Sequence, residues 1–70
     1  MDRTHQIDAA VVRIMKARSS LRHQDLIAAV FGQVRFPVKP VDVKRRIEAL
    51  LDRDYIERDD DDTQLYHYVA

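Results

Sequence analysis

The stretch that decides the fold is IDAAVVRIMKAR, residues 7–18. Its period is that of an amphipathic helix, in which each residue turns about 100° around the axis. The side chains that fall within about 60° of Ile7 on such a helix are Ala10, Val11, Ile14 and Arg18. Lys16 lies opposite, at about 180°, with Ala9 and Val12 beside it. A protein that only has to fold gains nothing by exposing a partly apolar strip around a lysine. This pattern therefore predicts a helix whose outer face contacts a partner.

Length and composition predict one small folded domain, residues 1–70. The chain is 46% apolar and 34% charged, with one glycine and two prolines, as in a globular protein. It has no cysteine, which excludes disulfides, thiolate metal sites and a cysteine nucleophile. No apolar run approaches the roughly 20 residues of a membrane span, and the first residues lack the apolar segment of a signal peptide. A soluble intracellular setting is therefore expected.

The net charge of zero conceals two oppositely charged parts. Residues 1–46 hold ten Lys and Arg against four Asp, whereas residues 47–70 hold two Arg against eight Asp and Glu. Such asymmetry suits either a basic binding surface with an acidic counterweight or two solvated faces.

The first helix is expected to begin near Asp2 to Thr4, either of which could cap it, and to end at Ser19 and Ser20 after Arg18. Leu21 follows as a lone apolar residue, long enough for one extended contact but too short for a strand.

Two further helices are predicted from apolar residues at three- and four-residue steps. In the first of them these residues are Leu26, Ile27, Val30, Phe31 and Val34. This helix has Asp25 in its first turn, is expected to be mostly core, and is weakened near its end by Gly32. An extended linker over residues 36–40 follows, because each proline biases its predecessor away from helix. The last helix starts at Pro40 and runs to about Asp52, with an apolar stripe of Val43, Ile47, Leu50 and Leu51.

The last part of the chain changes period. Residues 55–58 and 65–69 are rich in aromatic and branched side chains and flank a polar segment, residues 59–64. This pattern predicts a two-stranded hairpin with a long, loose turn. Three helices followed by a hairpin wing is the order of a winged helix, an α+β fold in which the second and third helices form a helix-turn-helix.

A winged helix suggests nucleic-acid binding, and the last helix partly agrees with it. Its start carries Lys39, Lys44, Arg45 and Arg46, which could contact phosphates or bases. The wing disagrees, since Asp59–Asp62 would meet the phosphates, and the pI of about 6.8 is below that of a nucleic-acid domain. Nucleic-acid binding through these four residues is therefore kept as an alternative function.

Signs of enzymatic chemistry are weaker. His5, His23 and His67 fall in three different elements with no His-x-x-x-His spacing, so neither a metal site nor any cofactor is expected. The run Asp59–Asp62 lacks the glycine and distal glutamate of a calcium loop. No Ser, His and Asp set suggests nucleophilic catalysis from sequence order, although spatial neighbours stay open.

Nearly the whole chain resembles the C-terminal winged-helix domain of cullins, the scaffolds of multi-subunit ubiquitin ligases. The segments that carry the resemblance are residues 7–18, FPVKP (36–40), KRRIE (44–48), DRDYIER (52–58) and YHYVA (66–70), with Asp2 and Arg3 before them. The segments FPVKP and DRDY are most similar to the cullin-four subgroup. The chain departs from the family pattern at Val11, where isoleucine is commoner, and at Ser19, where many members have a second basic residue.

The resemblance implies that the lysine of the VRIMK motif, here Lys16, forms an isopeptide bond with the C-terminal glycine of a ubiquitin-like neddylation modifier. Ala9, Val12 and Arg13 would then surround the docking site. The implied partners are the modifier, the RING subunit, the neddylation conjugating enzyme, the deconjugating complex and the cullin exchange factor. The domain would have no catalysis of its own, would act in cytoplasm and nucleus, and would activate ubiquitin transfer once modified. It would be the C-terminal fragment of a longer cullin, with Ala70 as the true C-terminus and Met1 as an added initiator.

Overall fold

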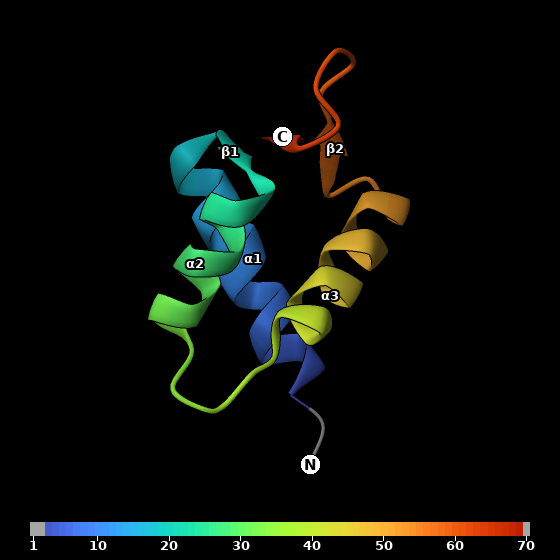
Figure 1. The fold of residues 1–70 in the computed structure, drawn as a ribbon. Helices are drawn as coiled ribbons and strands as arrows, with labels where there is room; N and C mark the ends of the chain where they lie inside the picture. The colour runs from blue at the N-terminus through green and yellow to red at the C-terminus, as the bar shows by residue number, and fades with distance from the viewer. Residues whose placement is uncertain (1–2, 70) are drawn as a thin grey trace.

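The computed structural model describes residues 3–69 of the chain. Within them lie three helices and three strands (Figure 1). In chain order these are α1 (Thr4–Arg18), β1 (Ser20–Arg22), α2 (His23–Gln33), α3 (Pro40–Asp52), β2 (Ile56–Arg58) and β3 (Leu65–Tyr68). The α+β winged-helix architecture predicted from the sequence is confirmed.

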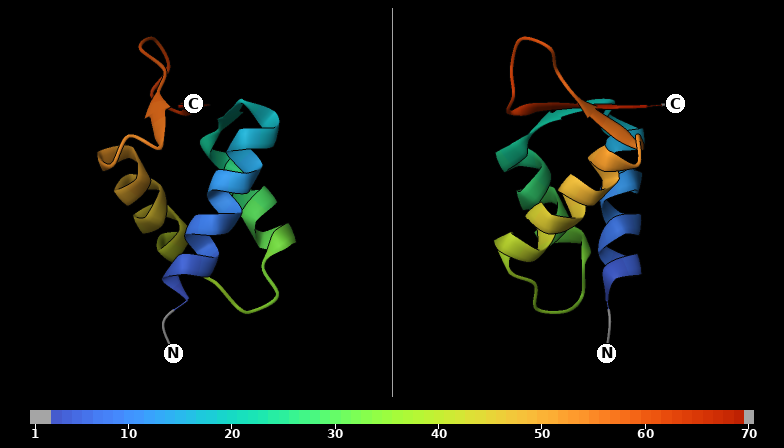
Figure 2. Two further views of the ribbon diagram at one scale, coloured as in Figure 1. Left: turned by 180° about the vertical axis from the view of Figure 1, so that it is seen from behind. Right: turned by 90° about the vertical axis from the view of Figure 1, so that its right-hand side faces the viewer.

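The three helices pack against one another as a bundle, and the small sheet closes one end of it. Both α2 and α3 pack against α1, and the wing loop between β2 and β3 projects beyond the sheet (Figures 1 and 2). The chain enters at the end of the molecule opposite the sheet and finishes beside the sheet (Figure 1). No helix within residues 3–69 combines the length and the apolar character needed to cross a membrane.

Helix α1 has the predicted length but not the predicted cap. Its N-cap residue is Arg3, which makes no side-chain capping hydrogen bond, and Thr4 is already helical. The other proposed cap, Asp2, lies outside the described residues. At the far end, Ser19 adopts a left-handed φ of 69° and its N–H donates to the carbonyl of Met15. The helix therefore ends at the predicted serine through a backbone turn.

The core is formed by one buried face from each helix together with residues of the sheet. Its buried members are Ile7, Ala10, Val11, Ile14, Met15, Leu21, Leu26, Val30, Val43, Ile47, Leu50, Ile56 and Tyr66. The helical wheel placed Arg18 on the inner face, and this was wrong: Arg18 is exposed, whereas Met15 has no exposed surface. A charged side chain in the last turn stays hydrated at little cost, and the unbranched thioether fills the core instead.

The prediction that the segment around Leu21 is too short for a strand is wrong. Strand β1 pairs antiparallel with β3, in the register Ser20↔His67, Leu21↔Tyr66 and Arg22↔Leu65. The sheet has the order β1-β3-β2, so it is three-stranded rather than a two-stranded hairpin. A three-residue strand has no local sequence signal, because its stability comes from a partner strand more than forty residues away.

The two later helices differ in how well they match expectation. In α2 only Leu26 and Val30 are buried, and Phe31 is 40% exposed, so this helix contributes less core than predicted. The α3 boundaries are as predicted, with proline in the first turn, and Leu51 is half-buried at its inner edge.

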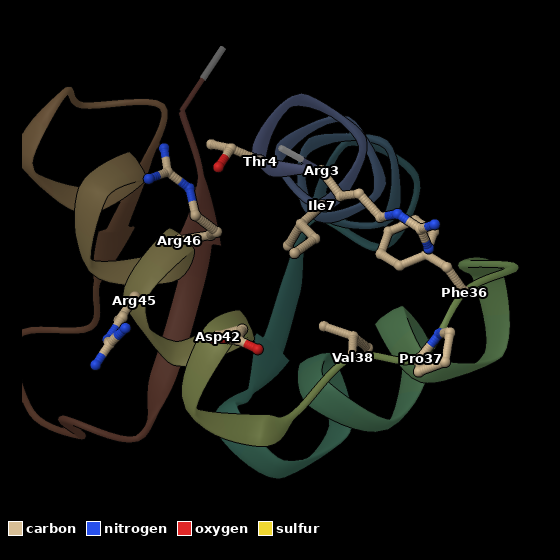
Figure 3. A pocket seen from close by; sticks show the side chains of 9 residues that line it. All are labelled: Arg3, Thr4, Ile7, Phe36, Pro37, Val38, Asp42, Arg45 and Arg46. Carbon is tan, nitrogen blue, oxygen red and sulfur yellow. The ribbon is translucent and has the colours of Figure 1, made fainter. Parts of the chain in front are cut away.

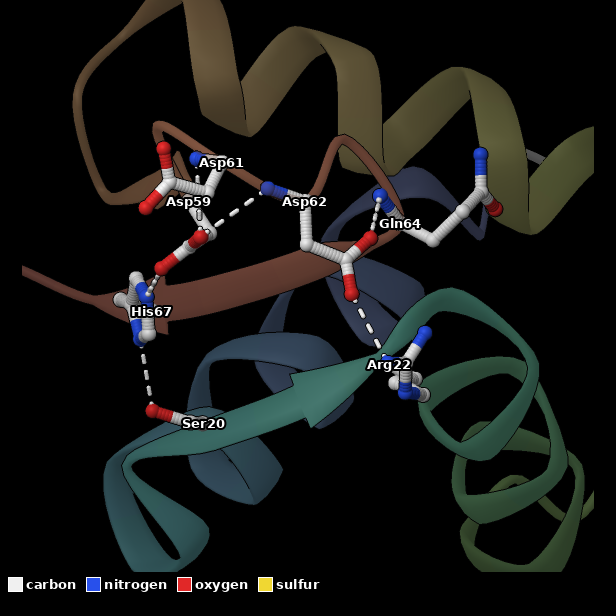
Figure 4. A network of polar contacts seen from close by, with 7 residues as sticks. All are labelled: Ser20, Arg22, Asp59, Asp61, Asp62, Gln64 and His67. Carbon is white, nitrogen blue, oxygen red and sulfur yellow. Dashed lines mark hydrogen bonds and ion pairs between the residues drawn. The ribbon is translucent and has the colours of Figure 1, made fainter.

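The wing loop is a long turn, as predicted, and it is closed by its own aspartates. The carboxylate of Asp59 accepts the backbone N–H groups of Asp61 and Asp62, each at 3.0 Å. The carboxylate of Asp62 accepts the N–H of Gln64 at 3.0 Å and pairs with Arg22 at 2.8 Å (Figure 4). Two of the four carboxylates thus serve as local caps.

Candidate functional site on helix α1

The outer surface of α1 presents Lys16 to solvent. Lys16 is exposed in the last turn, and the residues before it, Ile14 and Met15, are buried. Ala9, Arg13 and Ala17 are also exposed on this helix. The prediction that Lys16 faces away from the core is confirmed.

The strip around Lys16 is less apolar than the sequence suggested. Val12 is half-buried and packs against the core, whereas Ala9 is exposed. The accessible surface beside the lysine therefore consists of alanine and arginine more than of valine.

Arg13 is hydrogen-bonded to the end of α2. Its Nη1 donates to the Oε1 of Gln33 over 3.2 Å. Both residues line a groove of about 370 Å³ between α1 and the α2–α3 linker, to which Ala9 and Phe36 also contribute. Two of the three predicted docking residues, Ala9 and Arg13, thus lie at one groove.

An ion pair joins α1 to α3. Arg46 donates through Nε to Oδ1 of Asp8 at 2.7 Å and through Nη2 to Oδ2 at 2.9 Å. The side chains are only 26% and 18% exposed, respectively. This bidentate geometry fixes the orientation of the guanidinium and the carboxylate, so it holds α1 in place on α3.

The four candidate nucleic-acid contacts are therefore not equivalent. Lys39, Lys44 and Arg45 are exposed near the start of α3, but Arg46 is engaged with Asp8. The wing keeps exposed carboxylates at Asp60 and Asp61, where a winged helix would approach phosphates.

A second, basic cavity lies where the starts of α1 and α3 meet the linker (Figure 3). It measures about 360 Å³, and Arg3, Arg45 and Arg46 contribute side chains to its wall. The Arg3 guanidinium lies 4.4 Å from the ring centroid of Phe36, a cation–π contact that fixes this wall. The sequence predicts Arg45 and Arg46 together at the start of the last helix, but it gives no sign that Arg3 and Phe36 lie beside them.

The structure also assembles a Ser, His and Asp set that sequence order did not show. The Oγ of Ser20 lies 2.7 Å from Nδ1 of His67, and Nε2 of His67 lies 2.7 Å from Oδ1 of Asp59 (Figure 4). The hydrogen bond from His67, with support from the Asp61 N–H, lowers the pKa of the Asp59 carboxyl below its usual range. The pairing of β1 with β3 creates this set, so only recognition of β1 as a strand could have found it.

The other histidines have separate environments. Nδ1 of His23 lies 2.8 Å from the hydroxyl of Tyr66, and His5 is exposed on α1. Across residues 3–69, no three His, Cys, Asp or Glu side chains are grouped so as to hold a metal ion.

Comparisons of the chain with known proteins all point to the same family. The family model of the cullin protein neddylation domain matches residues 2–62. Human Cullin-4A is 59% identical over 69 residues, which is 99% of this chain. Cullin-4 of Caenorhabditis elegans is 54% identical over 69 residues, and Cullin-3 of Dictyostelium discoideum is 51% identical over 71 residues, each covering 99% of this chain.

A solved structure agrees with the sequence relatives. It is described as "A Dual E3 Mechanism for Rub1 Ligation to Cdc53: Dcn1(P)-Cdc53(WHB)". Its chain superposes with a TM-score of 0.91 at 38% identity, covering 97% of this chain and 80% of that one. The chain spans only 9% of the length of human Cullin-4A and 8% of the worm Cullin-4. The chain belongs to the cullin family as a winged-helix neddylation domain, and its relatives place it with the cullin-4 subgroup.

Proposed function

We propose that this chain is the C-terminal regulatory domain of a cullin-RING ubiquitin ligase and that Lys16 accepts the ubiquitin-like neddylation modifier. The observation that carries the proposal is the placement of Lys16, which is exposed at the end of an otherwise well-packed helix in a neddylation domain. The domain acts as a scaffold and as an acceptor, and it contributes no catalysis to the transfer.

The reaction is an acyl transfer to an amine. The Lys16 amine attacks the thioester carbonyl that joins the modifier's C-terminal glycine to the conjugating enzyme. A C–N bond forms, the C–S bond breaks, and the thiolate leaves. A lysine ammonium is a poor nucleophile at neutral pH, so the partner enzyme must take its proton.

The contribution of this chain is position. Asp8 and Arg46 hold α1 on α3, and the Ser19 turn ends the helix one turn after Lys16. A fixed helix presents the amine in a narrow range of orientations, and orientation alone can supply several kcal/mol of an acyl-transfer barrier.

The docking surround proposed for the conjugating enzyme is Ala9, Val12 and Arg13, with Val12 contributing only its exposed edge. The solved relative pairs Dcn1 with the Cdc53 WHB fragment, which supports a pathway factor as a partner. The RING subunit, the deconjugating complex and the cullin exchange factor are proposed as further partners, in cytoplasm and nucleus. Modification is proposed to release the domain from the RING subunit and to activate ubiquitin transfer.

The test uses the full cullin bound to its RING subunit, incubated with the neddylation enzymes. Wild type should gain one modifier, and Lys16→Arg should lose the isopeptide-linked product. The matched controls are Lys39→Arg and Lys44→Arg, the other two lysines of this chain, which should behave as wild type. Loss of the product in either control, with retention in Lys16→Arg, would assign the acceptor elsewhere.

The regulatory part of the proposal has a separate readout. Ubiquitin transfer by the complex should be faster after modification in wild type and unchanged after the same treatment of Lys16→Arg. Equal stimulation of both proteins would contradict the proposed activation.

A further inference from the structure

Ser20, His67 and Asp59 form a connected chain of side chains across the sheet. Ser20 is exposed on β1, His67 is half-buried on β3, and Asp59 is half-buried just after β2 (Figure 4). Both contacts are 2.7 Å, within the normal range of protein hydrogen bonds.

The partners of His67 determine which ring nitrogen carries the proton. The Asp59 carboxylate also accepts the N–H groups of Asp61 and Asp62, and these bonds favour its ionised form. An ionised carboxylate only accepts, so neutral His67 donates its Nε2–H to Asp59. Its Nδ1 lone pair then faces the Ser20 hydroxyl, which donates to it.

This arrangement is that of an activated nucleophile: a hydroxyl, a base within hydrogen-bond reach, and a carboxylate that orients the base. The β1–β3 register places Ser20 directly opposite His67, so the sheet itself sets the distance. The ring nitrogens have exchanged partners relative to the serine-protease arrangement, but each group keeps its role.

Ser20 is also close to the proposed acceptor in the sequence. It follows Lys16 by four residues, so the two Cα atoms are at most about 14 Å apart, the span of four extended residues. Both side chains are exposed, Lys16 at the end of α1 and Ser20 at the start of β1.

We propose that Ser20 is a second acceptor for the modifier, forming an oxyester with His67 as general base and Asp59 as positioning residue. This inference rests on the proposed function, because the acyl donor is the same modifier-charged conjugating enzyme. The Oγ of Ser20 attacks the thioester carbonyl and its proton passes to Nδ1 of His67. A C–O bond forms, the C–S bond breaks, and the leaving thiolate receives the proton from His67.

The product differs chemically from the one at Lys16. Hydroxylamine cleaves an ester and leaves an isopeptide bond intact, so the two adducts are distinguished on the same gel. Because the amide at Lys16 is the more stable product, the oxyester is best observed when Lys16 is replaced.

The experiment repeats the reconstitution with the full cullin and its RING subunit in the Lys16→Arg background. We expect a residual adduct that hydroxylamine removes and that mass spectrometry maps to Ser20. Adding Ser20→Ala should abolish it, whereas Ser19→Ala, the matched control, should retain it, because Ser19 contacts the rest of the fold through backbone N–H and carbonyl groups. His67→Gln should slow its formation by about 100-fold or more, the usual range for loss of a general base.

A structural effect of these changes is separated by keeping Lys16. In that background Asp59→Asn and His67→Gln should leave the hydroxylamine-resistant adduct at Lys16 unchanged, while Asp59→Asn lowers the Ser20 oxyester in the Lys16→Arg background. The inference is overturned if Lys16→Arg carries no hydroxylamine-labile adduct, or if that adduct survives Ser20→Ala. Failure of the proposed function has a different signature, namely no hydroxylamine-resistant adduct at Lys16 in wild type.

Discussion

The ion pair between Asp8 and Arg46 leads to the sharpest stability prediction. It joins two helices through two hydrogen bonds of 2.7 and 2.9 Å, and it involves one of the residues that the sequence offered as a nucleic-acid contact. If Arg46 is structural, replacing it must destabilise the fold, and the loss must depend on Asp8.

The expected coupling free energy between Asp8 and Arg46 lies between two limits. Exposed ion pairs contribute about 0–1 kcal/mol, and breaking a fully buried pair costs about 3–5 kcal/mol. The Arg46 and Asp8 side chains are 26% and 18% exposed, so we expect an intermediate coupling of about 1–2 kcal/mol. In a domain of this size each kcal/mol lowers the Tm by about 4–8 °C.

The assay is a double-mutant cycle of Asp8→Ala, Arg46→Ala and the double variant, measured by urea unfolding. Lys44→Ala is the matched control, since Lys44 is an exposed cation on the same helix. A coupling below about 0.5 kcal/mol, or equal losses for Arg46→Ala and Lys44→Ala, would refute a structural role for the pair.

Three further outcomes follow from buried or hydrogen-bonded groups. Ile47 has no exposed surface, so Ile47→Ala should cost about 2–5 kcal/mol and Ile47→Val about 0.5–1.5 kcal/mol by urea unfolding; equal losses would contradict close packing at this position. Tyr66→Phe removes the hydroxyl that lies 2.8 Å from His23 and should cost about 0.5–1.5 kcal/mol, and no change in the urea midpoint would count against this hydrogen bond. The hydrogen bond from His67 and the N–H of Asp61 lower the pKa of Asp59 below 3.8, so its stabilisation is complete above that value and is lost as the pH falls through the lowered pKa. Asp59→Asn should therefore be less stable than wild type at pH 7 and approach wild type in acid unfolding, whereas a constant difference down to pH 2 would contradict this.

The helices could be predicted from the sequence because their signals are local. Apolar spacing located α1 and α3, and Pro40 marked the start of α3. The exposure of Lys16 followed from the same helical period, because a lysine opposite the buried face has nowhere else to point. The N-cap of α1, which is Arg3, and the exposure of Arg18 in its last turn were less predictable. Contacts at helix ends depend on the neighbouring chain.

The sheet and its side-chain network could not be predicted in the same way. Strand β1 is three residues long and exists because it pairs with β3, which lies at the other end of the chain. The contact between Ser20 and His67 joins residues 47 positions apart, and it follows from that pairing alone. The histidines therefore looked isolated in the sequence, although His23 and His67 each have a defined partner in the fold.

Lys16 is proposed as the isopeptide acceptor of this cullin domain. The most direct test is mass-spectrometric mapping of the branched peptide from wild-type full cullin after reaction with the neddylation enzymes and treatment with hydroxylamine. We predict a single branch within this chain, on Lys16, that is absent from Lys16→Arg. A hydroxylamine-resistant branch on Lys39 or Lys44 in wild type would contradict it.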